Sequence, residues 1–464
     1  MTSPNVLLVF PDQHRGDWLG FRGTTGVATP NIDALAARGV AFENALTPSP
    51  LCSPARSCLA LARRYDRQPV LYNHLDVPDD AATIYRDLRE QGYDVLACGK
   101  FDLLKQSKDW GADGQHGSGD TSRLRHLGFT GGVDSAGKHD CITASQRGLA
   151  EPYATFLEER GLLQTHLDDF GGRGYGDEAY INVEPTALPD DAYCDNWIGG
   201  RAAALIETAQ SPWFMQVNFN GPHEPLDVTE SMRAAFADVD FDQPVDNDHY
   251  PADLHVNMRR NYAAMIHNID AWLGRFLDLI ERRGELDKTL VIYASDHGDS
   301  LGDHNRFQKH VPEHGSWNVP LVVAGPGVVT GNTVATPVDL VDVARTVLDF
   351  GGIAPNRPLD GGSLRPALEG GTLGWDARTG GLASWRAIFD GRYKYIHNYD
   401  RNRSIRDIMT ATWEPSREAP GVLYDLENDP GECEDLSRVD PGRMAEYRDL
   451  LLSSIDANPD EDTS

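Results

Sequence analysis

A nucleophile candidate, Cys52, lies in the run Leu51-Cys52-Ser53-Pro54-Ala55-Arg56. Because proline two positions later is preset for a first helical turn, we expect Cys52 to cap a helix that starts near Ser53. An anion beside Cys52 would then face the positive end of that helix. Arg56 lies one turn further along, where its side chain could hold the same anion. This pattern is typical of an enzyme that hydrolyses esters of an oxyanion.

A second set of candidates consists of metal ligands that follow short apolar runs. Asp12 and Gln13 follow one such run near the amino terminus, and Asp296 and His297 follow another. The runs have the composition of buried parallel strands, whose carboxyl ends share one edge of a sheet and its ligand site. Oxygen donors with one imidazole suit Ca²⁺, Mg²⁺ or Mn²⁺ better than a structural zinc. The sequence therefore predicts one divalent cation between these two segments.

Two more apolar runs end in residues that could hold an anion, because one leads to Lys100 and the other to His223. The chain has a formal net charge of −29, which opposes an anionic substrate at long range. A pocket for such a substrate must therefore concentrate a few cations locally. We expect Arg56, Lys100 and Lys309 to be those cations.

The nucleophile segment, Cys-x-Pro-Ala-Arg, resembles the signature of the type I sulfatases of the alkaline-phosphatase-like superfamily. Asp12-Gln13 and His297 resemble the metal motif of the choline sulfatase and phosphonate monoester hydrolase branch. The family signature usually continues with Leu-Thr-Gly-Arg, where this chain has Ala60-Leu61-Ala62-Arg63. The resemblance spans nearly the whole chain and implies hydrolysis of a sulfate ester to an alcohol and inorganic sulfate.

The family resemblance also implies a modification and a cofactor. A formylglycine-generating enzyme would oxidise Cys52, and the resulting aldehyde would touch a cation held by the four ligands above. Ca²⁺ is expected before Mg²⁺ or Mn²⁺. Hydrated formylglycine would supply the attacking hydroxyl, which the cation and Arg56 would keep ionised.

The same resemblance implies how the substrate is held. Lys100, His223 and Lys309 would bind sulfate oxygens and protonate the leaving alcohol, and which of the three is the acid stays open. Asp102 stands where the family usually has a histidine, and it could instead meet a cationic or hydroxylated part of the substrate. His139 is a further substrate-binding candidate. The expected substrate is a small-molecule or saccharide sulfate ester.

The length of 464 residues suits one large α/β domain and a smaller unit. We predict an alkaline-phosphatase-like catalytic domain over residues 1–350, with a mostly parallel central sheet between helices. Residues 351–464 are predicted to form a subdomain with a small antiparallel sheet, a hairpin turn at Asp390-Gly391 and a terminal helix. Residues 105–139, rich in glycine and polar side chains, predict a long loop over the site.

Composition also excludes classes of partner. The acidic charge disfavours nucleic acid and anionic membranes, and no apolar run approaches the roughly 20 residues of a membrane span. The amino terminus lacks a basic leader and a cleavage site, so we expect a cytoplasmic location. The six cysteines have no framework spacing, which predicts reduced thiols. A homo-oligomer stays open.

Three functions stay open from the sequence. The first is a formylglycine-dependent sulfatase, and the second is a phosphonate monoester or phosphodiester hydrolase with the same fold and nucleophile. The third is a binding protein without activity, for which the altered Ala60-Leu61-Ala62 is the motive. His310 and His314 have the spacing of helical zinc ligands, but Pro312 between them argues against such a helix.

Overall fold

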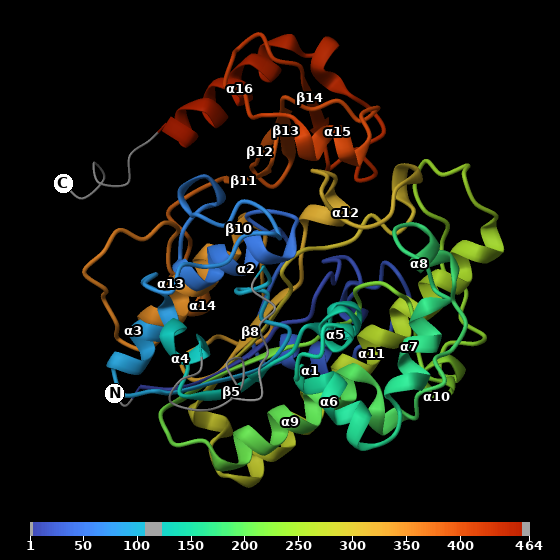
Figure 1. Cartoon of the computed structure of the whole chain (residues 1–464). Coiled ribbons are helices and arrows are strands. Elements are labelled where there is room, and N and C mark those ends of the chain that lie inside the picture. The colour runs from blue at the N-terminus through green and yellow to red at the C-terminus, as the bar shows by residue number, and fades with distance from the viewer. Residues whose placement is uncertain (1–2, 107–122, 457–464) are drawn as a thin grey trace.

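The computed structural model describes residues 3–106 and 123–456, and within them a sheet of eight strands forms the centre of the molecule (Figure 1). In spatial order the strands are β5 (Gly131–Asp134), β4 (Asp94–Gly99), β6 (Trp213–Asn218), β1 (Asn5–Val9), β7 (Thr289–Ala294), β8 (Leu321–Ala324), β2 (Val40–Phe42) and β9 (Asn332–Val334). The strands from β5 to β7 run parallel, β8 runs antiparallel to both its neighbours, and β9 is parallel to β2. The prediction of a mostly parallel central sheet is confirmed.

Strand β1 shows why residues 6–9 are all apolar. All of its residues are buried, and its side chains alternate between two helical layers. Val6 and Leu8 join one layer, whereas Leu7 and Val9 join the other. A parallel strand covered on both faces favours apolar side chains along its middle. The polar residues therefore come just after the strand, at the edge where the carboxyl ends of β4, β6, β1 and β7 meet.

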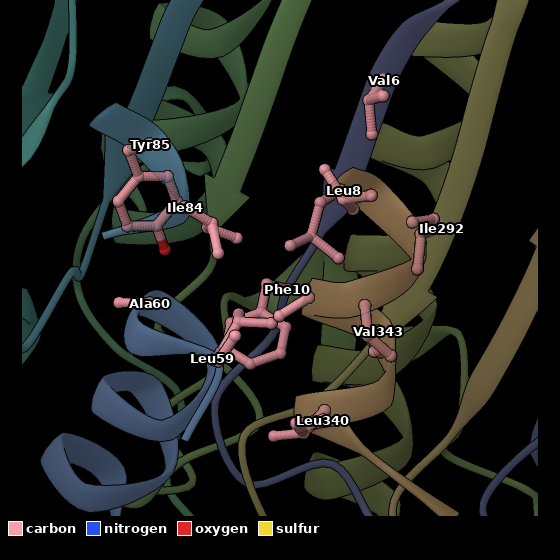
Figure 2. Close-up of a cluster of buried hydrophobic side chains, with 14 of the residues drawn as sticks. Val6, Leu8, Phe10, Leu59, Ala60, Ile84, Tyr85, Ile292, Leu340 and Val343 are labelled. Atoms are coloured by element: carbon pink, nitrogen blue, oxygen red, sulfur yellow. The ribbon is translucent and has the colours of Figure 1, made fainter. Parts of the chain in front are cut away.

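The first layer carries the nucleophile helix, α2. Its helices are α2 (Cys52–Leu61), α3 (Ile84–Glu90), α4 (Arg123–Leu127), α13 (Leu340–Phe350) and α14 (Arg365–Leu368). Figure 2 shows Leu59 of α2 and Val343 of α13 around Phe10, which directly follows β1. Each fully buried side chain of this kind contributes about 1.5–3 kcal/mol. This packing holds the first turn of α2 at the edge of the sheet.

The second layer covers the opposite face. Its helices are α1 (Pro30–Ala37), α5 (Gly137–Gln146), α6 (Pro152–Glu159), α9 (Cys194–Thr208) and the long α11 (Ala252–Arg282). The amino-terminal half of α11 also packs against a separate cluster around Trp18, which includes α8 (Glu178–Ile181). Helix α7 (Leu163–Gly171) lies between α6 and α8 in the chain.

One loop prediction is partly wrong. Residues 105–139 were expected to form a single long loop, but α4, β5 and the start of α5 occupy the later part of this range. Residues 107–122 lie outside the described residues. The glycine-rich β5 becomes a strand because it pairs with β4 at the edge of the sheet, and that tertiary pairing outweighs its weak intrinsic strand propensity.

The carboxyl-terminal part forms a second, antiparallel sheet. Its strands, in order, are β11 (Arg378–Leu382), β12 (Trp385–Phe389), β13 (Tyr393–His397) and β14 (Gly421–Asp425). Helix α16 (Pro441–Asp456) covers one face, and the other packs on Leu51 and Val311 of the larger unit. The predicted turn at Asp390-Gly391 joins β12 and β13, which confirms the smaller sheet-and-helix unit. None of the helices in the described part of the chain has the length and apolarity needed to cross a bilayer.

The remaining elements are short and lie around these sheets. Among them are β3 (Ala45–Leu46), which pairs with β10 (Val338–Asp339), and the helices α10 (Glu230–Ala234), α12 (His314–Trp317) and α15 (Ile405–Thr410). Helix α12 begins at His314 itself, so His310 and His314 do not share a helix and the prediction against a helical zinc pair is confirmed.

Candidate active site

Cys52 is the first residue of α2, and its thiol is buried beside the carboxyl ends of β1 and β7. Its Sγ lies 3.2 Å from Nε2 of His297 and 3.8 Å from Oδ1 of Asp12. Leu51, in extended conformation, precedes the helix. The prediction that Cys52 is the cap is therefore wrong by one residue. Proline is accommodated anywhere in the first turn, because those backbone amides have no partner inside the helix.

Asn73 contacts the same helix start and was not singled out from the sequence. Its Oδ1 accepts a hydrogen bond of 3.0 Å from the backbone N–H of Ser53, whereas Leu51 offers no side-chain cap. Asn73 thus satisfies one of the free amides of the first turn from a distant loop. That loop has no periodicity, so the sequence carries no signal for this contact.

Four side chains form a cluster of potential metal ligands. Asp12, Cys52, Asp296 and His297 each offer one donor atom, and these atoms lie within 4.8 Å of one another. His297 Nδ1 lies 2.9 Å from the carbonyl oxygen of Gly298, to which it can donate, so the lone pair of Nε2 faces the cluster. Two carboxylates and one imidazole fit a divalent cation of the Ca²⁺, Mg²⁺ or Mn²⁺ type.

Gln13 reaches the edge of this cluster in a fixed orientation. Its Oε1 accepts a hydrogen bond of 2.6 Å from Nζ of Lys309. Its amide nitrogen lies 2.6 Å from Oδ2 of Asp299 and 2.9 Å from Oε2 of Glu224. The hydroxyl of Tyr180 lies 2.6 Å from the same Asp299 oxygen. The side-chain oxygen of Gln13 is therefore turned towards the site, and its role as a metal ligand stays a prediction.

Arg56 lies behind the metal-ligand cluster. Its guanidinium donates to Oδ2 of Asp296 at 2.9 Å and to Oδ2 of Asp12 at 3.1 Å, and it also bonds the backbone oxygen of Lys100. We expected it to face the substrate anion directly, but it neutralises the two carboxylates instead. Asn218, at the end of β6, accepts a further bond of 3.2 Å from Arg56. The Nδ2 of Asn218 has no partner among the described residues.

Lys100 follows β4 and pairs with two carboxylates. Its Nζ contacts Oδ2 of Asp12 and lies 3.1 Å from Oδ2 of Asp102. Asp102 also pairs with Lys105 at 2.8 Å. The structure thus places Lys100 against the cluster, and Asp102 one step further out. A substrate contact of Asp102 stays a prediction, and such a contact would have to share this carboxylate with two lysines.

His223 and Lys309 contact each other beside the metal-ligand cluster. The Nζ of Lys309 lies 2.6 Å from Nε2 of His223, and Nδ1 of His223 lies 2.7 Å from the backbone oxygen of Glu224. The His223 side chain is 17 % exposed, against 0 % for Asp12 and His297 and 5 % for Lys309. His223 is therefore the most exposed of these side chains around the buried cluster.

His139 lies outside the cluster, in the first turn of α5. The preceding residue, Lys138, donates through Nζ to the backbone oxygens of His223 and Pro225, at 3.3 and 2.9 Å. His139 is thus next to the His223 segment, and its ring stacks on Tyr175, which was not among the predicted site residues. Its role in substrate binding stays a prediction.

The field of the site favours negative charge at Asp12 and Cys52. Burial raises the pKa of Asp12, but Lys100, His223, Arg56 and His297 outweigh burial and hold this pKa well below its usual value. Burial and Asp12 likewise raise the pKa of the Cys52 thiol, and Lys100 is first among the cations that bring it well below its usual value. An anion at position 52 is therefore stabilised.

The pKa values of two basic groups in the site are raised. Burial lowers the pKa of His297, but Asp296 and Cys52 together raise it to about 9. Burial also lowers the pKa of Lys309, and Cys52 and then Glu224 raise it above its usual value. A metal ion that binds Nε2 of His297 would therefore displace a proton.

Comparisons with known proteins agree with this geometry. The sulfatase family model matches residues 4–353. The chain is 26% identical to an arylsulfatase of Clostridium perfringens, over 98% of this chain and 95% of that protein. It is 27% identical to a choline-sulfatase of Rhizobium meliloti, over 98% of this chain and 87% of that protein. A phosphonate monoester hydrolase structure from Agrobacterium radiobacter superposes with a TM-score of 0.77 and 25% identity, over 98% and 96% of the two chains.

The family match covers most of the chain, including every residue of the cluster and both members of the His223–Lys309 pair. The mostly parallel sheet and the smaller antiparallel sheet agree with the structural neighbour. This chain therefore belongs to the sulfatase family, the sulfuric ester hydrolases with an alkaline-phosphatase-like fold.

Proposed function

We propose that this protein hydrolyses a sulfate monoester through a formylglycine derived from Cys52, releasing an alcohol and inorganic sulfate. The observation that supports this most is the convergence of Asp12, Cys52, Asp296 and His297 within 4.8 Å. These residues come from segments far apart in the chain, and Lys100, placed at the end of β4, contacts the same cluster. A formylglycine-generating enzyme would be the partner during maturation.

One divalent cation would be held by Asp12, Asp296 and His297, with position 52 and Gln13 beside it, and we expect Ca²⁺ before Mg²⁺ or Mn²⁺. Oδ1 of Asp12 supports this assignment, since Arg56 and Lys100 both take Oδ2 and leave Oδ1 facing Cys52. The cation and the hydrated aldehyde would supply a hydroxyl of lowered pKa as the nucleophile. Arg56 keeps the two carboxylates charged and in place.

The remaining side chains would bind sulfate and move the proton. Lys100 and Lys309 would be the cations that hold sulfate oxygens. His223 is the most exposed of these groups, so we assign it as the acid that protonates the leaving alcohol. Lys309, 2.6 Å from Nε2 of His223, would hold this ring in place beside the sulfate group. Residues 1–350 would carry this chemistry, with residues 351–464 as the supporting subdomain.

The decisive experiment combines the mass of the Cys52 peptide with an activity assay. The protein is produced together with a formylglycine-generating enzyme, and the peptide is expected to show the conversion of thiol to aldehyde. The converted protein should release sulfate from 4-nitrophenyl sulfate, and the Cys52→Ala variant should not. A converted protein that releases sulfate from no aryl, alkyl or sugar ester would contradict the proposal.

A phosphonate monoester hydrolase is the second candidate, because the Agrobacterium radiobacter enzyme of that name is a structural neighbour at 25% identity. The two reactions need the same nucleophile and similar cations, so geometry separates them poorly. Rates with paired 4-nitrophenyl sulfate and 4-nitrophenyl phenylphosphonate would separate them. A faster phosphonate reaction would favour this second candidate.

A further inference from the structure

We propose that Tyr175 and His139 form a stacking surface beside the active site, which holds the ring of a cyclic sulfate ester, either the flat face of an aryl ring or the C–H face of a sugar ring. This inference rests on the proposed function and adds the class of substrate. Its starting point is the first turn of α5, which touches both sides of the site.

The contacts of that turn define its position. A Cβ at Gly137 would lie 2.0 Å from Oδ1 of Asn220 and 3.4 Å from Cδ of Lys100, so the chain there passes directly beside the Lys100 side chain. Lys138 bonds the backbone oxygen of His223, and Asp140 lies 3.9 Å from Lys105. His139 therefore lies near both the Lys100 segment and the His223 segment, beside the most exposed side chain of the site.

The His139 ring is fixed by two aromatic neighbours. It stacks on Tyr175 with ring centroids 5.4 Å apart and an interplanar angle of 25°, and it meets Phe170 edge-on at 5.3 Å. Helix α7, which carries Phe170, is tied to α5 because His166 Nε2 lies 3.0 Å from the backbone oxygen of Lys138. The stack is therefore supported by two helices, and its outer member, Tyr175, is far more exposed than the half-buried His139.

Tyr175 is held in this exposed position by the structure of its loop. It is 80 % exposed, the largest exposure of any large hydrophobic side chain among the described residues. The glycines on either side have φ of +74° and +62°, which other residues rarely adopt. Arg173, buried at the base of the loop, bonds Asp169 and the backbone oxygens of residues 182 and 184. The loop is thus anchored while its tip presents a ring.

This surface is aromatic and uncharged, so it favours a ring in the alcohol moiety of the substrate. His139 stacks on Tyr175, and the Tyr175 ring is 80 % exposed, so it can also stack on an aryl ring or on the C–H face of a sugar. Burial, assisted by His223, lowers the pKa of His139 to about 4, so the pair adds no positive charge near neutral pH. An acyclic alkyl chain has no ring face that could stack on Tyr175. The exposed ring of Tyr175 would therefore favour a cyclic alcohol moiety over an acyclic one of similar size.

The test measures binding separately from turnover. In a Cys52→Ala background, phenyl sulfate, glucose 6-sulfate and hexyl sulfate are titrated calorimetrically against the parent protein and against Tyr175→Ala, Tyr175→Phe and Val439→Ala. Val439 is a matched control, because it is 79 % exposed and lies outside the site. Tyr175→Ala should weaken at least one ring-bearing ester about three- to tenfold and leave hexyl sulfate unchanged, the effect expected of one aromatic stack. Tyr175→Phe and Val439→Ala should bind as the parent does.

The outcomes distinguish an aryl ring from a sugar ring, and they test the stacking surface separately from the proposed function. A loss confined to phenyl sulfate identifies an aryl ring, and a loss confined to glucose 6-sulfate identifies a sugar ring. Equal loss for all three esters, no loss, or no binding of any ester overturns the stacking surface. If the binding difference is found but the converted native protein hydrolyses no sulfate ester, the proposed function fails and the stacking surface stands. Hydrolysis without any Tyr175 effect gives the reverse result.

Discussion

Asp12 and Asp296 are fully buried carboxylates that share one guanidinium, that of Arg56. Removing a carboxylate from water costs several kcal/mol, which a partner must offset. Arg56 and Lys100 offset part of this cost, and a bound cation would offset the rest. At the scale of single residues, the site is therefore a balance of buried charges, and changes that disturb this balance should be visible in stability as well as in activity.

Gln13→Glu should destabilise the protein. The amide nitrogen of Gln13 lies within hydrogen-bond distance of both Asp299 and Glu224, and a glutamate would place a third carboxylate against these two. We expect the free energy of unfolding to fall by about 3 kcal/mol in denaturant titrations with a chelator present. The double variant Gln13→Glu/Asp299→Asn should recover part of the loss. A single variant as stable as the parent would mean that the amide is not oriented by these carboxylates.

Lys309→Met should lower kcat about 100- to 1,000-fold with the best sulfate ester, because it removes a sulfate-binding cation and the hydrogen-bond partner of His223. Lys105→Met is the matched control. Lys105 pairs with Asp102, one step away from the cluster, so its loss should change kcat much less. Equal losses in the two variants would argue for a general charge effect instead of a specific role.

Helix α2 carries the nucleophile, and its first turn is stabilised from outside. Asn73→Ala removes the acceptor for the Ser53 amide and should cost about 1 kcal/mol of stability, as loss of a helix cap does. Asn73→Asp keeps an acceptor and should be close to the parent. Chemical denaturation of the three proteins checks this, and an Asn73→Ala variant with unchanged stability would show that water replaces the contact.

The start of α6 carries a carboxyl group whose titration should affect stability. Glu151 accepts hydrogen bonds from the amides of Ala154 and Ala136, yet burial raises its pKa from 4.5 to about 7. The folded protein therefore keeps a proton that the unfolded chain releases above pH 4.5. This contribution to stability is complete below pH 4.5 and is lost as the pH rises through 7.

From this shift we expect Glu151 to cost about 3 kcal/mol of stability between pH 4.5 and 8. In Glu151→Gln this part of the pH dependence should disappear. The measurement is the free energy of unfolding of both proteins at several pH values. Parallel pH profiles for parent and variant would contradict the raised pKa.

At the scale of the whole molecule, the carboxyl-terminal sheet supports the segment that leads away from Lys309. Lys394 of β13 is fully buried, pairs with Glu432 and donates a bond of 2.7 Å to the backbone oxygen of Pro312. Trp385 of β12 donates a bond of 3.1 Å to the backbone oxygen of His310. The two units are thus joined through buried polar contacts as well as through apolar packing.

Lys394→Met should therefore destabilise the entire protein by about 3–5 kcal/mol, because it leaves the buried Glu432 carboxylate without its ion-pair partner. Lys394→Met/Glu432→Gln should recover part of that loss. Calorimetry should show a single transition for the parent, since the two units share an apolar cluster. Two separate transitions in the parent would contradict this coupling.

Much of the architecture could be predicted from local patterns. The apolar runs before Asp12 and Asp296 identify buried strands, and the spacing of apolar residues over 258–280 identifies the long α11. The periodicities of strands and helices depend on neighbouring residues, so they can be recognised in the sequence alone. The loop prediction over residues 105–139 failed where β5 depends on its pairing with β4, which no local pattern records.

By itself, the sequence determined which residue types could do the chemistry and at which strand ends they stand. The tertiary structure decided their partners, and Cys52 and His297 are in contact although 245 residues separate them. It also turned Arg56 towards the carboxylates, oriented Gln13, and stacked the exposed Tyr175 on His139. The physical reason is that burial produces a periodic pattern of apolar residues along the chain. The partner of a buried polar side chain depends instead on loops and distant strands that meet only in the folded molecule.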